Sequence, residues 1–365
     1  MIQYFSHVDL HSFCVSIFKK IGYDSELAKQ ASDVLLSADL RGVDSHGVAR
    51  LSGYVRLWEV KRILVDVRPS IIHETPSTAV VDGGSGLGLV VAPYSMNLAI
   101  EKALSVGSGW VSVQNSSHFG IAGIHAMMAL PYNMIGIAMT NASPIVAPTF
   151  SSSRMLGTNP IAVAVPAGEE PAFIADFATT TVANGKLEIM QRLGQSIPTG
   201  WVQTKEGESS TDPNELKNGG ALLPLGGDRE HSGHKGYMLG SVVDILSAVL
   251  SGANFGPFVP PFPAYIPMPT FMPGKGIGHF FGALRIDAFR LAADFKKDMD
   301  LWIRSFRKAN PKNINQSVLI PGDLERKMEI ERKASGIPLL ESVIKDLQLL
   351  GNKLGVEFPH ALTIE

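Results

Sequence analysis

The stretch VVDGGSGLG at residues 80–88 decides which nucleotide-binding folds this chain can adopt. It joins an apolar run to a run with helical spacing, where a dinucleotide-binding loop would lie. The Rossmann fingerprint needs the spacing G-x-G-x-x-G/A and an acidic residue about 20 positions later. Counting from Gly84 ends on Leu89. Counting from Gly86 ends on Val91, and no acidic residue follows at the required distance. The fingerprint is therefore absent, and we interpret the stretch as a plain strand-to-helix turn.

The hydrophobic pattern around this turn predicts an α/β fold. From about residue 70, short runs of β-branched and small residues alternate with runs at helical spacing. The connection between Val165 and Ala172 is too short for a helical crossover, so the strands that it joins must be antiparallel. We therefore expect a mixed sheet with strands within 78–83, 109–115, 134–141, 160–168 and 172–180, and helices within 92–107 and 122–133.

Both ends of the chain carry helical patterns. We expect helices before Gly22 and within 26–42, 46–64, 289–310 and 341–355. Asp24 or Ser25 is expected to cap the second helix and Ser45 the third. The predicted architecture is a central mixed-sheet cofactor-binding domain of non-Rossmann type over 73–285, flanked by a helical domain built from 1–72 plus 286–365.

Composition excludes several classes of protein. The net charge of −2 argues against a duplex-binding surface, so no nucleic-acid partner is expected. A hydrophobic fraction of 45% against 18% charged residues is typical of a folded chain. Cys14 is the single cysteine, which excludes an intrachain disulfide framework and fits a reducing, cytoplasmic location. No export or membrane segment is expected, because we interpret the apolar stretch 237–255 as a buried core helix.

Residues 257–273 combine seven prolines with large apolar side chains, among them Phe258, Phe262, Tyr265 and Phe271. Prolines disfavour helix and strand interiors, and the apolar side chains disfavour a solvated linker. We interpret the segment as an ordered loop laid over a site or an interface. A connection that merely covers the core is an equally weighted alternative.

The segment DSHGVAR at 44–50 could carry chemistry. His46 and Arg50 lie four residues apart and would share one helix face. A histidine can move a proton to or from an alcohol or carbonyl oxygen, and an arginine can hold a carboxylate in a bidentate fork. Together they would suit a 2-hydroxy or 2-oxo acid. The alternative is a surface helix that starts at a capping serine.

Other polar groups follow apolar runs. His118, Asp176 and the turns at 140–144 and 157–160 stand where α/β sheets place ligands, although each fits a cap or an ordinary turn equally well. Lys235 lies near a helix N-terminus, which suggests an anionic ligand such as a phosphate. An exposed lysine is the alternative. No metal site is expected, because the histidines and carboxylates match no metal-binding motif.

Taken together, these segments resemble the malate/L-lactate dehydrogenase family of nicotinamide-dependent oxidoreductases that lack the Rossmann fold. The resemblance spans roughly residues 5 to 345. Its marks are DSHGVARL at 44–51, SSHFG at 116–120, GTNPIAVAVP at 157–166, DFATTTVANGK at 176–186 and GHKGYML at 233–239.

The resemblance implies roles for individual residues. His46, with Ser45 beside it, corresponds to an acid/base histidine, His118 to a second active-site histidine, and Arg50 to the group that binds the substrate carboxylate. Thr158 and Asn159 are placed with the substrate. The cofactor, NAD or NADP, is expected to contact Ala142, Asp176, Phe177, Ala178, His234, Lys235, Pro321, Gly322 and Asp323. Aspartate stands at 323 where the family usually has glutamate.

The function that the resemblance implies is hydride transfer between NAD(P) and C2 of a small 2-hydroxy or 2-oxo acid, malate and oxaloacetate by preference. The alternatives are another 2-oxo acid or a cyclic imine as substrate (lactate, ureidoglycolate, sulfolactate or diketogulonate type), and a non-catalytic binding protein on the same fold. A homodimer is expected. The choice between NAD and NADP, and between His46 and His118 as the proton carrier, stays open.

Overall fold

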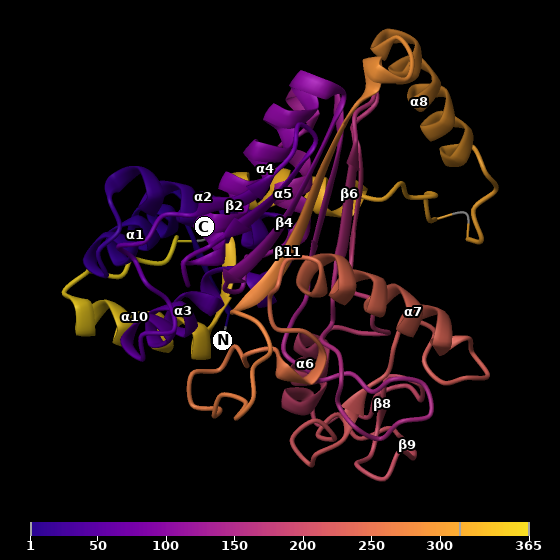
Figure 1. Cartoon of the computed structure of the whole chain (residues 1–365). Coiled ribbons are helices and arrows are strands. Elements are labelled where there is room, and N and C mark those ends of the chain that lie inside the picture. Colours follow the sequence, from indigo (N-terminus) through magenta and orange to yellow (C-terminus); the bar gives the residue numbers. More distant parts are fainter. Residues whose placement is uncertain (1, 314, 364–365) are drawn as a thin grey trace.

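The computed structural model describes residues 2–313 and 315–363, and its centre is a seven-stranded mixed sheet (Figure 1). The strand order is β2-β3-β4-β11-β5-β6-β7, in which β3 and β4 are parallel and the other neighbours are antiparallel. The expected mixed sheet is thus confirmed. The strands are β2 (Ser70–Glu74), β3 (Thr78–Asp82), β4 (Ser108–Ser116), β5 (Met134–Thr140), β6 (Ile161–Val165), β7 (Phe173–Phe177) and β11 (Ile277–Arg285).

Helices α4 (Gly88–Val106) and α5 (Ala122–Met127) pack on this sheet. Glycines in the strands let the helices approach. A Cβ at Gly109 would lie 1.9 Å from the carbonyl oxygen of Ala99 in α4, and one at Gly136 would lie 1.9 Å from that of Ala126 in α5. The interpretation of residues 80–88 as a strand-to-helix turn is confirmed, because β3 ends at Asp82 and α4 begins at Gly88.

The two ends of the chain share one hydrophobic core. Strand β1 (Ile2–Phe5) pairs antiparallel with β12 (Ile337–Leu340). Helices α1 (His7–Lys20), α2 (Ser25–Leu40), α3 (Leu51–Glu59) and α10 (Glu341–Leu354) contribute to the same core. Asp24 caps α2, as expected: its side chain accepts a hydrogen bond from the Leu27 backbone NH (2.9 Å).

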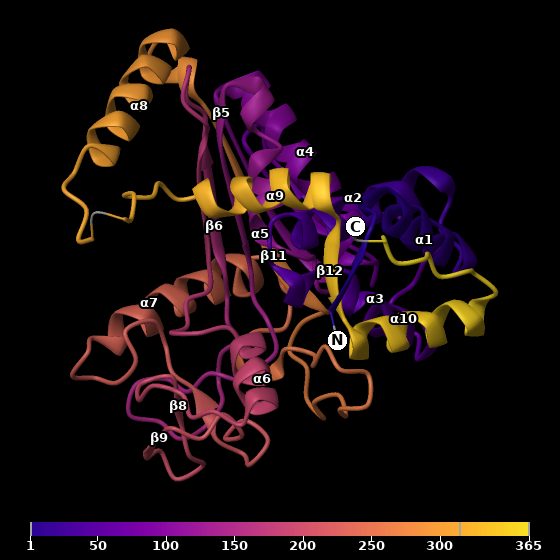
Figure 2. The same ribbon diagram turned by 180° about the vertical axis from the view of Figure 1, so that it is seen from behind.

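The remaining C-terminal helices lie elsewhere. Helix α9 (Asp323–Ser335) crosses the back of the sheet, and α8 (Ala292–Arg307) lies at the end of the sheet away from α1 and α10 (Figures 1 and 2). The proposed domain boundaries stay a prediction.

A smaller lobe below the sheet contains α6 (Asn184–Leu193) and the short strands β8 (Val202–Gln203), β9 (Ser209–Ser210) and β10 (Ala221–Leu222). Helix α7 (Gly233–Asp244) and the π-helical turn Ile245–Val249 connect it to β11. None of the helices within the described residues is long and apolar enough to cross a membrane.

The expectation of a buried helix over 237–255 is wrong. One side packs inward, with Gly240, Val243, Asp244, Ser247 and Ala248 buried, and a Cβ at Gly278 in β11 would lie 2.1 Å from the carbonyl oxygen of Ser247. The opposite side carries exposed apolar residues, namely Met238, Leu239, Val242, Ile245, Val249 and Leu250. Apolar content alone could not distinguish a helix buried all round from one with an uncovered apolar face.

Two fully buried histidines stabilise the sheet next to β4. His279 on β11 lies between the hydroxyls of Thr140 (2.7 Å) and Ser116 (2.8 Å), and Phe119 stacks on it at 4.7 Å between ring centroids. His125 bonds the Phe119 carbonyl oxygen at 2.8 Å. Burial lowers the pKa of His279 to about 3 and that of His125 to about 4, so both imidazoles are neutral in the folded protein at neutral pH.

We therefore expect the His279→Gln variant to lose stability less steeply in acid than the parent protein. Below the usual histidine pKa of 6.5, His279 binds a proton in the unfolded chain but stays neutral in the folded protein. The free energy of unfolding therefore falls as pH falls toward 3. Removing one such group should reduce the slope by up to about 1.4 kcal/mol per pH unit. Urea unfolding of both proteins at pH 6 and pH 5 measures this slope of the free energy of unfolding against pH. Equal slopes for the two proteins would contradict the expectation.

Candidate active site

A cavity of about 1140 Å³ opens at the edge of the sheet where β4, β5 and β7 end and β11 begins. Ligand pockets commonly measure about 300–1,000 Å³, so this one has room for a dinucleotide together with a small acid. Of the residues predicted from the sequence, it is lined by Ser45, His46, Arg50, His118, Ala142, Thr158, Asp176, Phe177, Ala178, Pro321 and Gly322.

Four predicted residues do not line the cavity. Asn159 is buried behind its wall, where the side chain bonds the Ala142 NH (3.1 Å) and the Gly240 carbonyl (2.9 Å). His234 and Lys235 lie in the first turn of α7, and Lys235 is exposed. Asp323 is held in an ion-pair network described below.

Two half-buried histidines from separate segments meet in the cavity. The ring centroids of His46 and His118 lie 5.4 Å apart with the planes nearly parallel. The Nδ1 atom of His46 lies 2.9 Å from the Ser45 hydroxyl, and that of His118 lies 2.7 Å from the Tyr54 hydroxyl. Each Nδ1 is thus occupied, which leaves each Nε2 for a ligand.

The environment keeps both imidazoles neutral at neutral pH. Burial, with the nearby Arg50 cation, lowers the pKa of His46 to about 4. Burial, followed by the charges that His46 and Arg50 would carry, holds the pKa of His118 well below its ordinary value. A neutral imidazole that carries its hydrogen on Nδ1 can accept a proton at Nε2, and the hydroxyl beside Nδ1 accepts that hydrogen in both the neutral and the charged ring.

The local fold of the DSHG segment differs from the expected helix start. Residues Asp44–His46 and Val48–Arg50 form two short 3-10 turns, and α3 begins only at Leu51. The expectation that Ser45 caps a helix is wrong, because its hydroxyl bonds the His46 ring instead. The cause is the buried Asp39, which accepts a hydrogen bond from the Val48 NH (2.7 Å) and lies where a Cβ at Gly47 would be.

Arg50 is placed to hold an anion beside the histidines. Its Nε atom donates to the Ser45 carbonyl oxygen at 2.6 Å, and its guanidinium carbon lies 5.5 Å from the centre of the Phe262 ring. Its two Nη groups form no hydrogen bond with any atom of residues 2–313 and 315–363. The outer fork of the guanidinium is therefore free for a carboxylate.

The part of the cavity lined by residues 120–123 and the end of β7 suits a cofactor. Asp176 ends the β7 wall, and its side chain accepts a hydrogen bond from the Gly123 NH at 2.7 Å. Desolvation within the cavity raises the pKa of Asp176 to about 6. Gly120, Gly123 and Gly322 present bare backbone to the cavity, which lets a ligand approach closely.

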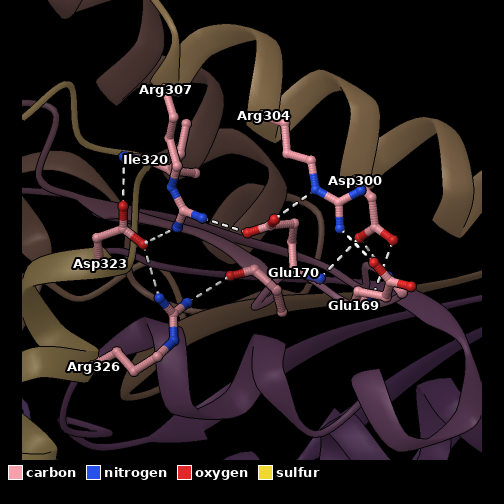
Figure 3. Close-up of polar contacts among 10 residues, drawn as sticks. Glu169, Glu170, Asp300, Arg304, Arg307, Ile320, Asp323 and Arg326 are labelled. Carbon is pink, nitrogen blue, oxygen red and sulfur yellow. Dashed lines mark hydrogen bonds and ion pairs between the residues drawn. The ribbon is translucent and has the colours of Figure 1, made fainter.

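An ion-pair network supports the wall formed by residues 319–325 (Figure 3). Asp323 lies between Arg307 (3.0 Å) and Arg326 (2.9 Å), and its carboxylate also accepts from the Ile320 NH at 2.9 Å. The Ile174 NH donates to the Pro321 carbonyl oxygen at 3.0 Å, which fixes the wall to β7. Asp323 therefore shapes the wall from behind.

Sequence reasoning missed Tyr54 and named Phe262 only as part of the loop expected over a site or an interface. Tyr54 on α3 bonds His118, 64 positions away, and no local motif indicates such a partner. Phe262 contacts both His118 and Tyr54. The proline-rich segment was the available signal for it, and the structure places that segment along the cavity. Within the described residues no cluster of His, Cys, Asp and Glu could hold a metal ion.

Comparisons with known proteins agree with this geometry. The family model for malate/L-lactate dehydrogenase matches residues 5–348. Malate dehydrogenase of Pyrococcus horikoshii is 42% identical over 95% of this chain and 94% of its own length. Malate/(S)-sulfolactate dehydrogenase of Methanothermus fervidus is 38% identical over 95% and 96%.

Solved structures show the same likeness. The P. horikoshii malate dehydrogenase structure superposes with a TM-score of 0.89 at 38% identity, covering 98% of this chain and 97% of that one. The malate dehydrogenase of Entamoeba histolytica gives 0.91 at 34% identity, covering 99% and 100%. Fold and family model define a dehydrogenase that acts on CH–OH donors with a nicotinamide cofactor. The chain belongs to the malate/L-lactate dehydrogenase family, which confirms the resemblance seen in the sequence.

Proposed function

We propose that the protein oxidises and forms a small 2-hydroxy acid, with malate and oxaloacetate as the preferred pair. The observation that carries the proposal is the placement of two neutral histidines beside Arg50 in one cavity. An acid of this class presents a carboxylate and a hydroxyl on adjacent carbons, which matches a guanidinium next to an imidazole. The names of the relatives support malate.

The bound cofactor, NAD or NADP, supplies or takes up the hydride at C2. We propose that Ala142, Asp176, Phe177, Ala178, Pro321 and Gly322 hold it, with His234 and Lys235 on the phosphate side and Asp323 behind the wall. The bare backbone at Gly120 and Gly123 and the cavity volume fit such a group.

The protein's own residues orient the acid and move the proton. Arg50 binds the carboxylate, and Thr158 and Asn159 shape the neighbouring wall. In oxidation, Nε2 of a histidine accepts the hydroxyl proton, while the hydroxyl on its Nδ1 accepts the hydrogen of the charged ring. In reduction, the same nitrogen returns the proton to the carbonyl oxygen.

Absorbance at the nicotinamide band tests the proposal with NADH and NADPH. The compounds assayed as substrates are oxaloacetate, pyruvate, sulfopyruvate and a cyclic imine carboxylic acid. We expect the highest kcat/KM with oxaloacetate. A higher value with the cyclic imine would favour an imine reductase. Cofactor binding without turnover of any compound would favour a non-catalytic binding protein on this fold.

We further propose that the protein is a cytoplasmic homodimer and that the exposed apolar side of α7 and its π-helical turn forms the interface. Met238, Val242, Ile245 and Val249 follow one another at helical spacing, and 48–60% of each side chain is exposed. An uncovered apolar stripe of this kind usually marks an interaction surface. The single cysteine fits the cytoplasm.

Val242→Asp together with Ile245→Asp should therefore convert the dimer to a monomer, because two charges in an apolar interface lose their hydration. Light scattering after size-exclusion chromatography at several concentrations measures the mass. Leu349→Asp, on the exposed side of α10, is the matched control and should leave the mass unchanged. A dimeric double variant would place the interface elsewhere.

A further inference from the structure

We infer that Phe262 sets the size of the substrate tail that this site accepts. The inference rests on the proposed function and concerns a residue of the proline-rich segment. Phe262 lines the cavity. Its ring lies 5.1 Å from the His118 ring and 5.5 Å from the Arg50 guanidinium carbon, measured from the ring centroid. One side chain thus borders both His118, one of the two active-site histidines, and the carboxylate-binding group.

The backbone around Phe262 is fixed. Its NH donates to the Ser143 hydroxyl (3.0 Å), which itself bonds the Pro260 carbonyl oxygen (3.4 Å). Arg62 donates to the carbonyl oxygen of Pro261. Prolines at 260, 261 and 263 restrict φ on both sides. The ring is therefore held at its place, whereas further along the segment Tyr265 is 83% and Phe271 62% exposed.

Helix α3 is shaped to receive the ring. Gly53 has no side chain, and a Cβ there would lie 2.8 Å from Cε1 of Phe262 and 2.9 Å from Cζ. The next residue, Tyr54, packs edge-to-face on the ring at 5.5 Å. The glycine provides the space, and the tyrosine that bonds His118 forms the adjacent side. The Phe262 ring and the His118 ring are therefore both supported by α3.

This placement of the Phe262 ring limits the size of the substrate tail that the site can accept. A 2-oxo acid with its carboxylate at Arg50 and its carbonyl oxygen at His118 bridges two groups that both contact the Phe262 ring. The space beside C2 is bounded by an aromatic ring that cannot move away. We expect the protein to favour acids with short tails, such as oxaloacetate and pyruvate, over acids with an aromatic tail, such as phenylpyruvate.

Phe262→Ala tests the inference, because it opens the space beside C2. The ratio of kcat/KM for phenylpyruvate to that for oxaloacetate should rise at least about tenfold relative to the parent. Phe262→Leu, which keeps an apolar core contact, should give an intermediate ratio and serves if the alanine variant is unstable. Phe271→Ala is the matched control: it lies in the same segment but does not line the cavity, so its ratio should equal the parent's.

The outcomes separate the two proposals. Turnover of oxaloacetate by the parent with an unchanged ratio in both Phe262 variants would overturn this inference and leave the proposed function standing. A rise of the same size in Phe271→Ala would overturn it as well, because loosening of the whole segment would then be the cause. No turnover of any 2-oxo acid by the parent would overturn the proposed function, and the inference with it.

Discussion

Replacing His46 with alanine should lower kcat by at least about a hundredfold, the usual contribution of a general acid or base. His46 lies in the cavity, its Nδ1 is engaged by the Ser45 hydroxyl, and its Nε2 is left to exchange a proton with the substrate. Alanine removes that nitrogen and leaves the carboxylate site at Arg50 intact. Steady-state kinetics with NADH and oxaloacetate measure the change.

Two further variants serve as a control and as a comparison for His46→Ala. His73→Ala, an exposed histidine on the edge strand β2, should keep the parental kcat. His118→Ala compares the two candidates directly, and the variant with the larger loss identifies the proton carrier. Added imidazole should restore part of the activity of that variant, which a structural defect would not allow. A folded His46→Ala protein with parental kcat would remove His46 from the mechanism.

The sequence predicts the sheet better than it predicts the strand order. The short connection between Val165 and Ala172 correctly requires an antiparallel pair, and it becomes the turn between β6 and β7. The central strand β11 was not foreseen. It pairs with β4 and β5, whose residues lie more than a hundred positions earlier, so no local pattern indicates that it fills the gap between them.

In the candidate site, too, the sequence predicts local features better than contacts between distant segments. Residues within one motif, such as His46 and Arg50, reach the same cavity because they are close in the chain, although no single helix carries both. Contacts between motifs depend on tertiary packing, and the bond between Tyr54 and His118 is such a contact. Even the DSHG segment was predicted as a helix start, because the buried carboxyl of Asp39 that shapes its turns cannot be recognised from the sequence.

Arg50→Lys is expected to raise KM for oxaloacetate about tenfold to a hundredfold, with a smaller change in kcat. Lysine keeps the charge but loses the planar fork that can bind both oxygens of a carboxylate. A hydrogen bond to a charged group contributes about 1.5–3 kcal/mol, which corresponds to roughly that change in affinity. Lysine also loses the stacking of the guanidinium on Phe262. Steady-state kinetics give KM, and quenching of tryptophan fluorescence gives the affinity for the cofactor.

The affinity for NADH decides how such a result is interpreted. Arg50 lies beside Ser45 and His46 and is not among the residues proposed to hold the cofactor, so the dissociation constant of NADH should stay at the parental value. Arg56→Lys is the matched control, because Arg56 lies in α3, which directly follows Arg50, but bonds Asp346 at the surface (2.8 Å). The Arg56→Lys variant should change neither the KM for oxaloacetate nor the dissociation constant of NADH. A parental KM for oxaloacetate in Arg50→Lys would exclude the bidentate carboxylate contact. A weaker affinity for both ligands would instead mean that Arg50 supports the cavity as a whole, through its bond to the Ser45 carbonyl.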